Sequence, residues 1–454
     1  MTVQNAERII FHIDVNSAFL SWSALERLKA GDVLDIRTVP SIVGGDQSSR
    51  HGIVLAKSIP AKAYGIHTAE PVGSALKKCP SLIIVPPEHG RYREYSQQMM
   101  MFLHGYTSDI EQASIDECYL DFTPIAHRFA SPIEAAHEIR ERIRDGLGFT
   151  VNVGISNCKI LAKMASDFEK PDKVHTLWPE EIPDKMWPLP VEDLHMVGHA
   201  TAARLHSLGI HTIGQLAHTD PAFLTTHFHS HGQRMWDFAH GIDDRIVDPI
   251  EREASSVGNS ITLSADCTSP EEAQQILLGL CDKVAGRLRK YGQQAQTVQV
   301  DIKYSDFRRA SHQAPLLSPT DTSAILYEEA ARLFRECWTG RPIRLLGIST
   351  SNLVNPGDPV QMSLFDLEGS LTGTPFDTRR IPASPAITPD LSSSSSKITQ
   401  KNFSSGINSS LGSSRDPVKL RKLEQALDQI RSRYGDRSIQ RGSRILQDQK
   451  PEGQ

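Results

Sequence analysis

The chain is organised around the stretch Ser114-Ile115-Asp116-Glu117-Cys118-Tyr119-Leu120-Asp121-Phe122, in which two adjacent carboxylates interrupt what otherwise reads as a pair of strands. Residues 110–114 and 118–122 have the short, bounded pattern of strands, which predicts a tight hairpin tip at residues 115–117. Because acidic residues are depleted in strands, the pair of acids at this tip needs its own explanation. The hairpin is therefore the first candidate for a functional site.

A third carboxylate ends an apolar strand near the N-terminus, where residues 9–13 are followed by Asp14. Pairing this strand beside the hairpin would bring Asp14, Asp116 and Glu117 to one end of a sheet, where they repel one another unless cations neutralise them. Hard oxygen ligands favour Mg²⁺, and two such ions roughly 3.5–4 Å apart form the usual site for in-line nucleotidyl transfer. The alternative is that these acids are simply solvated at strand ends.

Length, charge and cysteine content limit the classes of protein that fit. A chain of 454 residues predicts several domains, each able to bury its own core. The net charge of −5 argues against a uniformly basic nucleic-acid coat, although local basic faces remain possible. The 6 cysteines lack metal-ligand spacing and fit a reduced, cytoplasmic location. No apolar run of about 18 residues is present, so we predict neither export nor a membrane span.

Strand and helix patterns alternate through the first part of the chain. Residues 31–79 read as a small insert of short strands and turns. Around this insert, the order strand, helix, hairpin, helix, strand predicts a ferredoxin-like α+β unit. Its further predicted elements are a helix at 18–28, a strand at 82–85, helices at 91–104 and 132–145, and a strand at 150–155.

Two further units and a tail follow. Residues 179–248 contain short helices, with a helix, tight turn and helix predicted at 191–195, 196–199 and 200–208. Residues 252–353 predict a small α+β module because a helix at 270–290 precedes the strict polar and apolar alternation of residues 297–304. A helix at 325–337 and a strand at 343–353 complete this module.

The composition changes again near the C-terminus. The Ser-, Thr- and Pro-rich segment 354–415 predicts a flexible tail. An amphipathic helix is predicted at 416–435, because Asp416-Pro417 opens it and Gly435 closes it. Its apolar stripe either docks on the chain itself or binds a partner; the stripe consists of Leu420, Leu423, Leu427, Ile430 and Tyr434.

The ordered motifs resemble the DinB-like (polymerase IV) branch of the Y-family translesion DNA polymerases, from about residue 8 to about residue 365. The motifs that carry the resemblance are Ile13-Asp14-Val15 with Phe19, Ser114-Ile115-Asp116-Glu117, Val153-Gly154-Ile155-Ser156 through Leu161-Ala162-Lys163 to Lys170-Pro171, Val197-Gly198 with Leu208-Gly209-Ile210, and Gly258-Asn259-Ser260.

The resemblance implies a right-hand polymerase. Its ferredoxin-like palm would comprise residues 1–30 and 80–178, and its small fingers would comprise residues 31–79. A helical thumb with a helix-hairpin-helix would follow at 179–248, and an α+β little finger at 252–353.

The resemblance also assigns roles at the active site. Asp14 and Asp116 would be ligands of two Mg²⁺ ions, Val15 would add its backbone carbonyl, and Glu117 would be the third carboxylate. Lys170 and Lys62 would bind the nucleotide triphosphate. The alternative is that Lys170 is a solvated lysine on the protein surface.

Phe19 would be a steric gate that excludes the ribose 2′-hydroxyl, and simple core packing is the alternative for this side chain. The sequence departs from the family where threonine, tyrosine and arginine usually surround the triphosphate, because Ala56, Ile59 and Lys62 stand there. This change loses hydrogen bonds and a bidentate fork. Asn16 also replaces a commoner acid.

Phosphate contacts with DNA are predicted in two places. Gly198, in the helix-hairpin-helix turn, would let a DNA phosphate approach the backbone, although an ordinary helix connection is the alternative. Basic residues of the little finger would contact the DNA backbone. The alternative is that they are solvated side chains on the surface of a helix. These residues are Lys283, Arg287, Arg289, Lys290, Lys303, Arg308 and Arg309.

The segment Gln361-Met362-Ser363-Leu364-Phe365 resembles the peptide by which bacterial polymerases bind the sliding clamp, with Met362 in place of the usual leucine. Gln361, Leu364 and Phe365 would make the contacts. The alternative is that the two apolar side chains cap the core of the neighbouring module.

The sequence thus predicts a monomeric, template-directed DNA polymerase of the translesion type, without proofreading, that acts on primer-template DNA and deoxynucleoside triphosphates. One alternative is a noncatalytic polymerase-like scaffold that binds DNA and the clamp. A nucleotidyl cyclase on a similar palm is another, against which the DNA-binding thumb argues. Primer extension with Mg²⁺ separates the polymerase from the scaffold, and dependence on duplex DNA separates it from the cyclase.

Overall fold

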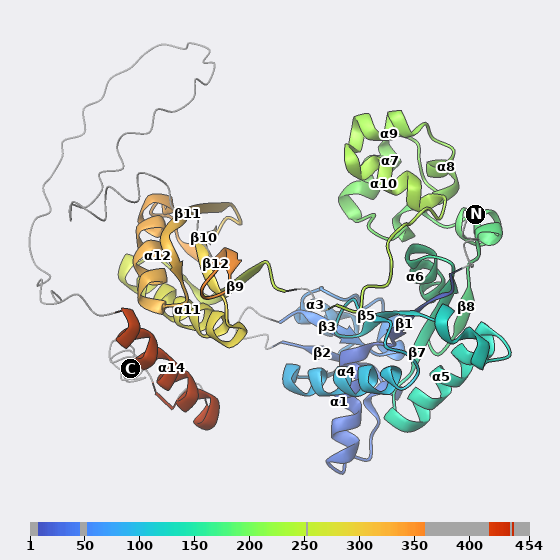
Figure 1. The fold of residues 1–454 in the computed structure, drawn as a ribbon, viewed down its shortest axis with the longest axis horizontal. Helices are drawn as coiled ribbons and strands as arrows, with labels where there is room; N and C mark the ends of the chain where they lie inside the picture. The colour runs from blue at the N-terminus through green and yellow to red at the C-terminus, as the bar shows by residue number, and fades with distance from the viewer. Residues whose placement is uncertain (1–7, 46–51, 251–252, 359–416, 436–437, 440–454) are drawn as a thin grey trace, which may run out of the picture. The chain divides into compact units, whose positions relative to one another are not determined.

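The structure is a computed structural model that describes residues 8–45, 52–250, 253–358, 417–435 and 438–439 (Figure 1). The chain divides into two compact units, Met1–Glu253 and Ala254–Gln454. Within the described ranges, no helix combines the length and the apolar character needed to cross a membrane.

A five-stranded sheet with the order β5-β6-β1-β7-β8 forms the centre of the first unit. Strand β1 (Ile10–Val15) lies antiparallel between β6 (Glu117–Asp121) and β7 (Val151–Ser156). Strand β5 (Ile110–Gln112) pairs antiparallel with β6, and β8 (Val174–Thr176) pairs parallel with β7. The order of β5, β6, β1 and β7 is that of a ferredoxin-like sheet, as predicted.

The side chains of β1 alternate between two buried layers. Phe11 and Ile13 join a core with α1 (Ala18–Lys29), α4 (His89–His104) and α5 (Pro132–Leu147). His12 points the other way, because its ring contacts Ser166 on α6 (Lys159–Asp167). A Cβ on Gly154 of β7 would lie 2.0 Å from the Ala162 carbonyl oxygen, so only glycine lets α6 pack this closely. The site described below depends on this packing.

A separate three-stranded sheet has the order β3-β2-β4. Strand β2 (Ser41–Gly44) pairs antiparallel with β3 (Val54–Lys57) and parallel with β4 (Ile83–Val85). The short helices α2 (Ile59–Ala63) and α3 (Val72–Lys78) accompany it. The sequence grouped the strand at 82–85 with the larger sheet, which was wrong, because a three-residue apolar strand carries no signal that selects its partner.

Short helices form the segment after β8. They are α7 (His199–Ser207), α8 (Ile213–Ala217), α9 (Pro221–Phe228) and α10 (Ser230–Ala239). Three single turns precede them, at Pro179–Glu181, Ile182–Met186 and Val191–Asp193. The helix predicted at 191–195 is thus only one 3₁₀ turn, and Met196 then adopts a left-handed φ of 75°, which stops a helix.

The second unit contains a four-stranded antiparallel sheet with the order β11-β10-β12-β9. Helices α11 (Pro270–Tyr291) and α12 (Ser323–Cys337) pack on one face. Val298, Val300 and Ile302 of β10 (Gln294–Tyr304) are buried there, which confirms the predicted alternation. The strand predicted at 343–353 is β12 (Ile343–Val354).

The sequence missed two strands of this sheet, β9 (Ser256–Cys267) and β11 (Arg309–Thr320). Both lie at the edges of the sheet and are largely exposed, so their residues need not be apolar. Strand β11 contains Pro315 and Pro319, which an edge strand tolerates and a central strand does not.

The C-terminal helix α14 (Pro417–Tyr434) packs beside α11. It docks on the chain itself, one of the two alternatives left open by the sequence. However, the buried side is charged, since Glu424 is 3% exposed while Leu423 of the apolar stripe is 57% exposed. Asp416, the predicted first residue of the helix, lies outside the described residues.

Candidate active site

A cavity of about 500 Å³ lies between the large and small sheets of the first unit. Its wall combines the turn from β1 into α1, the turn from β3 into α2, and the hairpin tip. Six of the seven side chains and backbone groups predicted at the active site line it: Asp14, Val15, Phe19, Lys62, Asp116 and Lys170. Glu117, the seventh, does not line this cavity.

Strand register brings the three carboxylates together. Asp14 lies directly opposite Glu117 in the β1–β6 pair, and the Val15 N–H donates to the Asp116 carbonyl at 3.0 Å. The predicted convergence of β1 and the hairpin at one sheet end is therefore present. Within the described residues, no group of three or more His, Cys, Asp or Glu side chains is arranged to hold a metal.

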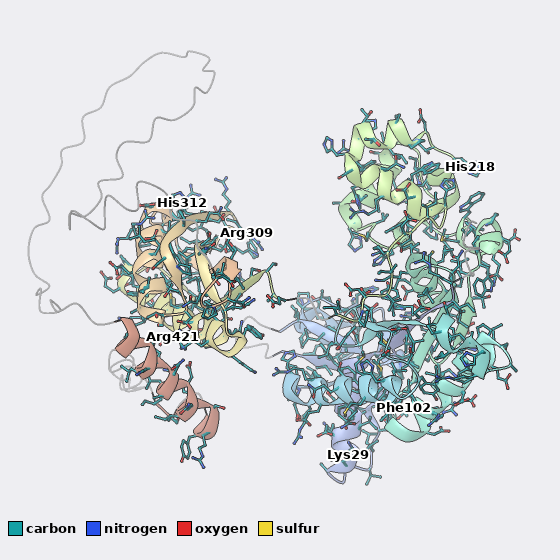
Figure 2. All side chains as sticks on the ribbon, in the orientation of Figure 1. Lys29, Phe102, His218, Arg309, His312 and Arg421 are labelled. Carbon is teal, nitrogen blue, oxygen red and sulfur yellow. The ribbon has the colours of Figure 1, made fainter. Side chains whose placement is uncertain are left out.

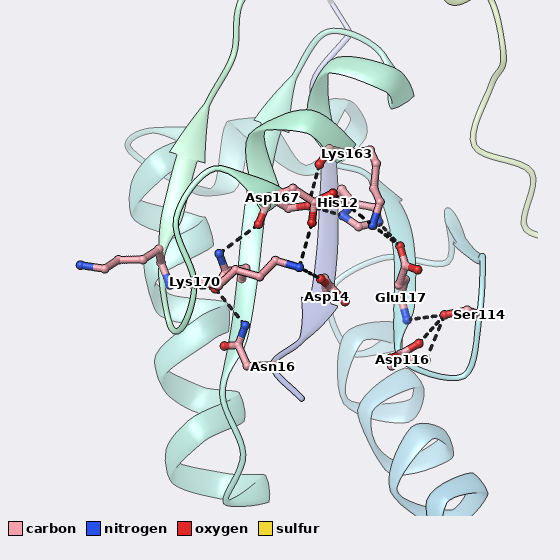
Figure 3. A network of polar contacts seen from close by, with 12 residues as sticks. His12, Asp14, Asn16, Ser114, Asp116, Glu117, Lys163, Asp167 and Lys170 are labelled. Carbon is pink, nitrogen blue, oxygen red and sulfur yellow. Dashed lines mark hydrogen bonds and ion pairs between the residues drawn. The ribbon is translucent and has the colours of Figure 1, made fainter. Parts of the chain in front are cut away.

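Asp14 forms an ion pair with Lys170, whose Nζ also lies 2.8 Å from Asp167 Oδ1 (Figure 3). Burial raises the pKa of Asp14, and Lys170 opposes that shift. Burial disfavours the Lys170 ammonium, but the two carboxylates outweigh this, so the pKa of Lys170 is raised. Lys170 is thus a cation at the wall of the cavity that Asp14 and Asp116 also line.

Glu117 is held by two partners that the sequence analysis did not identify. His12 Nε2 lies 2.9 Å and Lys163 Nζ 2.6 Å from Glu117 Oε2 (Figure 3). The hydrogen bond with His12, followed by the Lys163 contact, lowers the pKa of Glu117 to about 2 despite burial. The one sequence feature that could have identified His12 is its spacing, because it precedes Asp14 by two residues and so lies on the same side of the strand.

Ser114 shapes the hairpin tip. Its hydroxyl donates to Asp116 Oδ1 at 2.6 Å and accepts from the backbone N–H groups of Asp116 at 3.2 Å and Glu117 at 3.1 Å. A serine that bonds backbone groups two and three residues ahead stabilises a tight turn. Ser114 therefore fixes the orientation of the two adjacent acids.

Phe19 is half-buried and lines the cavity, while its ring stacks on Tyr92 at 4.6 Å between centroids. Both interpretations of this residue, gate and packing, are thus compatible with its place. Asn16 is buried and structural: its Nδ2 donates to Asn152 at 3.0 Å and its oxygen accepts from the Asp172 N–H at 2.9 Å.

Three residues of the β3–α2 segment that depart from the family pattern line the cavity. Ala56 is buried, Ile59 is 61% exposed, and all three of Ala56, Ile59 and Lys62 line the cavity. Lys62 therefore presents an ammonium group to the cavity, where the family usually has the forked guanidinium of an arginine.

The residues predicted to contact DNA differ in their accessibility and in their contacts within the protein. Gly198 caps the N-terminus of α7, and no atom lies within 4 Å of the position its Cβ would occupy, so the backbone there is open. Arg287 on α11 is exposed, although it donates to the Gly258 carbonyl at 2.7 Å. Arg308 is 73% exposed, and Arg309 is exposed at the start of β11 (Figure 2).

Arg289 requires a correction. Its side chain is 6% exposed and bonds Glu424 at 2.6 Å and Asp428 at 2.6 Å, both on α14. A guanidinium sealed between two carboxylates cannot reach a phosphate, so we withdraw Arg289 as a DNA contact. Helical periodicity alone could not reveal this, because the acids come from more than 130 residues further along the chain. The predicted clamp peptide 361–365 lies outside the described residues.

The ligand atoms available in the cavity are of the chemical type that Mg²⁺ prefers. Asp14 and Asp116 present hard carboxylate oxygens to one cavity, and Val15 lines it beside them. Soft ligands are absent from the described lining, which contains neither cysteine nor histidine.

Comparison with known proteins gives matches along most of the chain. The impB/mucB/samB family matches residues 13–167, the IMS family HHH motif matches 179–210, and the impB/mucB/samB family C-terminal domain matches 254–364. DNA polymerase IV of Clostridium acetobutylicum is 48% identical over 359 residues, which cover 79% of this chain and 90% of that protein. DNA polymerase IV 1 of Bacillus subtilis is 38% identical, over 81% of this chain and 88% of that protein.

A solved Y-family DNA polymerase chimera shares the fold, with a TM-score of 0.68 and 23% identity over 76% of this chain and 99% of the chimera. The extent and identity of the sequence matches, together with this fold and the carboxylates at one sheet end, place the chain in the impB/mucB/samB family, within the DinB-like branch of the Y-family translesion DNA polymerases.

Proposed function

We propose that this translesion DNA polymerase extends primers by two-metal nucleotidyl transfer, with Asp14, Asp116 and Glu117 as its carboxylates and Val15 as a backbone ligand. Membership of the family implies dependence on divalent metal. The observation that carries the finer proposal is the strand register that sets Asp14 opposite Glu117, with Asp116 in the same cavity as Asp14.

Two Mg²⁺ ions, when bound, would activate the primer 3′-hydroxyl and neutralise charge on the triphosphate. Asp14 and Asp116 would hold them, with the Ser114 hydroxyl orienting Asp116. Lys170 would exchange its contact with Asp14 for a phosphate oxygen, which needs only a point charge. Glu117, fixed by His12 and Lys163, would stand near the primer end.

The wall opposite the carboxylates would receive the nucleotide. Lys62 would contact the triphosphate, and Phe19 would lie under the sugar, where a ribose 2′-hydroxyl would clash with its ring. The stacking of Phe19 on Tyr92 supports this role, because the contact restricts movement of the Phe19 ring away from the sugar.

Primer-template DNA would be held by phosphate contacts outside the cavity. We assign these to the helix-hairpin-helix turn at Gly198 in a thumb of residues 179–248, and to Arg287 and Arg308 in a little finger of residues 252–353. Such contacts position DNA without reading its sequence. Residues 31–79 would serve as fingers.

The remaining parts of the proposal concern the setting of the reaction. A monomer would bind the sliding clamp through Gln361, Leu364 and Phe365 and act in the cytoplasm. The thiols support a reducing compartment, since all six cysteines lie in the described ranges and none forms a disulfide there.

The deciding experiment is primer extension by the Asp116→Asn variant. We expect extension to fall at least about a thousandfold, because a metal ligand is lost, while affinity for primer-template DNA stays within about twofold. Asp109→Asn, which alters a carboxylate that does not line the cavity, is the matched control. Near-normal extension by Asp116→Asn would overturn the catalytic assignment, and a wild type that binds DNA without extending it would favour the noncatalytic scaffold.

A further inference from the structure

One wall of the active-site cavity carries two lysines that form no ion pair with a carboxylate among the described residues. Lys57 ends β3 and Lys62 lies on α2, and both line the cavity. The Lys57 ammonium donates to the Thr68 hydroxyl at 3.2 Å, a neutral partner that also lines the cavity. The positive charge of this wall is therefore not balanced by an ion pair with the described parts of the chain.

Neighbouring lysines behave differently. Lys78, on the same small subdomain, lies 2.7 Å from Glu70, and Lys170 is paired with Asp14 and Asp167. Burial lowers the pKa of Lys57 and the nearby charge of Lys62 lowers it further, while the negative charge of Glu70 opposes the shift without reversing it. Two like charges beside a cavity cost free energy unless an anion occupies the space between them.

The end of β3 borders the cavity. Ala56 and Lys57 both line it, whereas Val54 at the start of the strand is fully buried. Leu55 lines the cavity as well. Asp14 and Asp116 line the same cavity, which thus combines carboxylates from β1 and the hairpin tip with ammonium groups from β3 and α2.

We propose that Lys57 is a second triphosphate-binding residue, which acts with Lys62 on the phosphates of the incoming nucleotide. This inference rests on the proposed function and adds a residue that the family resemblance does not assign. Lys62 stands where the family usually has an arginine fork, and one lysine supplies only a single point charge. Two lysines on one wall supply two charges and so replace the bidentate contact.

The test compares Lys57→Ala with Lys57→Arg and with the control Lys77→Ala. Lys77 is an exposed lysine of the same subdomain that does not line the cavity. Steady-state extension should show KM raised about tenfold by Lys57→Ala for all four deoxynucleotides, as expected for one lost charge-assisted hydrogen bond, with kcat changed less than KM. Lys57→Arg should restore most of the affinity, and Lys77→Ala should match the wild type.

A binding measurement without turnover completes the test. Inorganic tripolyphosphate should protect the wild-type chain from thermal unfolding, and Lys57→Ala should raise its half-saturating concentration about tenfold. Affinity for primer-template DNA should not change. An unchanged KM and unchanged tripolyphosphate binding would overturn the proposal, as would a loss of DNA affinity instead, which would make Lys57 a DNA contact.

The two hypotheses fail in different ways. If the wild type extends primers but Lys57→Ala equals it in KM and in tripolyphosphate binding, only the role of Lys57 is wrong. If the wild type does not extend primers while tripolyphosphate binding still depends on Lys57, the polymerase mechanism is wrong and the phosphate site stands. A KM effect confined to one of the four nucleotides would also overturn the proposal, because it would indicate a contact with the base.

Discussion

Two networks of basic and acidic side chains, one in each unit, show opposite uses of the same chemistry. In the first unit, Lys170 pairs with Asp14 at a cavity wall, and 37% of the lysine side chain is exposed. In the second unit, Arg289 pairs with Glu424 and Asp428, and only 6% of the Arg289 side chain is exposed. The first network is open to a cavity, whereas the second is largely buried.

The second network is also reciprocal. Arg421 on α14 lies 2.6 Å from the buried Asp321, so each side supplies both a cation and an anion (Figure 2). Glu424 further accepts from the backbone N–H of Ser323 in the first turn of α12. These contacts explain why α14 docks by its charged side. An arginine that lies close to other basic residues in the sequence therefore need not contact nucleic acid.

The largest effect is expected in the sealed network. Arg289→Met should destabilise the docking of α14 by about 3–5 kcal/mol, because the buried Glu424 and the partly exposed Asp428 lose their partner. Hydrogen exchange of the α14 amides, read alongside thermal unfolding, measures this. Arg287→Met, an exposed neighbour on α11, should change stability by less than about 0.5 kcal/mol. Equal effects of the two variants would remove the distinction between sealed and open networks.

The next effect concerns acid stability of the first unit without metal. The pKa of Glu117 is about 2 in the folded chain against an ordinary value of 4.5. A lowered folded pKa adds stability above pH 4.5, which is lost as the pH falls towards 2. After discounting for partial exposure, we expect about 1–2 kcal/mol. Glu117→Gln should flatten the fall in unfolding free energy in this range, and an unchanged slope would contradict the role of His12 and Lys163.

A smaller effect tests whether the open cavity selects its sugar. Phe19→Ala should raise ribonucleotide incorporation relative to deoxynucleotide by at least about tenfold, or roughly 1.4 kcal/mol, because the clash with the 2′-hydroxyl is removed. Phe129→Ala, which removes a partly buried ring away from the cavity, is the control. A ratio unchanged from wild type would leave Phe19 as core packing only.

The smallest effect on the enzyme itself is expected at the clamp peptide. Leu364→Ala with Phe365→Ala should leave extension on short linear DNA unchanged but remove stimulation by the loaded clamp, because tethering raises local concentration without new active-site contacts. Extension assays with and without loaded clamp measure this. Equal stimulation of wild type and double variant, or an unfolded double variant, would assign the segment to the core.

Much of the fold followed from periodicity. The ferredoxin-like order, the helix at Pro270–Tyr291 and the alternating strand Gln294–Tyr304 were predictable, because burial of one face imposes a period on the residues. The edge strands β9 and β11 and the sheet partner of β4 were not, because an exposed edge imposes no such period and short strands carry little register information.

The sequence by itself determined the positions of Asp14, Asp116 and Glu117, because acids at strand ends are unusual enough to stand out. Only the tertiary structure decided what surrounds them. Lys163 meets Glu117 because Gly154 lets α6 approach the sheet, and His12 meets it from the neighbouring strand β1. Arg289 is sealed because α14 returns from far along the chain. Local patterns encode which face a residue takes, but the partner on that face is chosen by packing between distant segments.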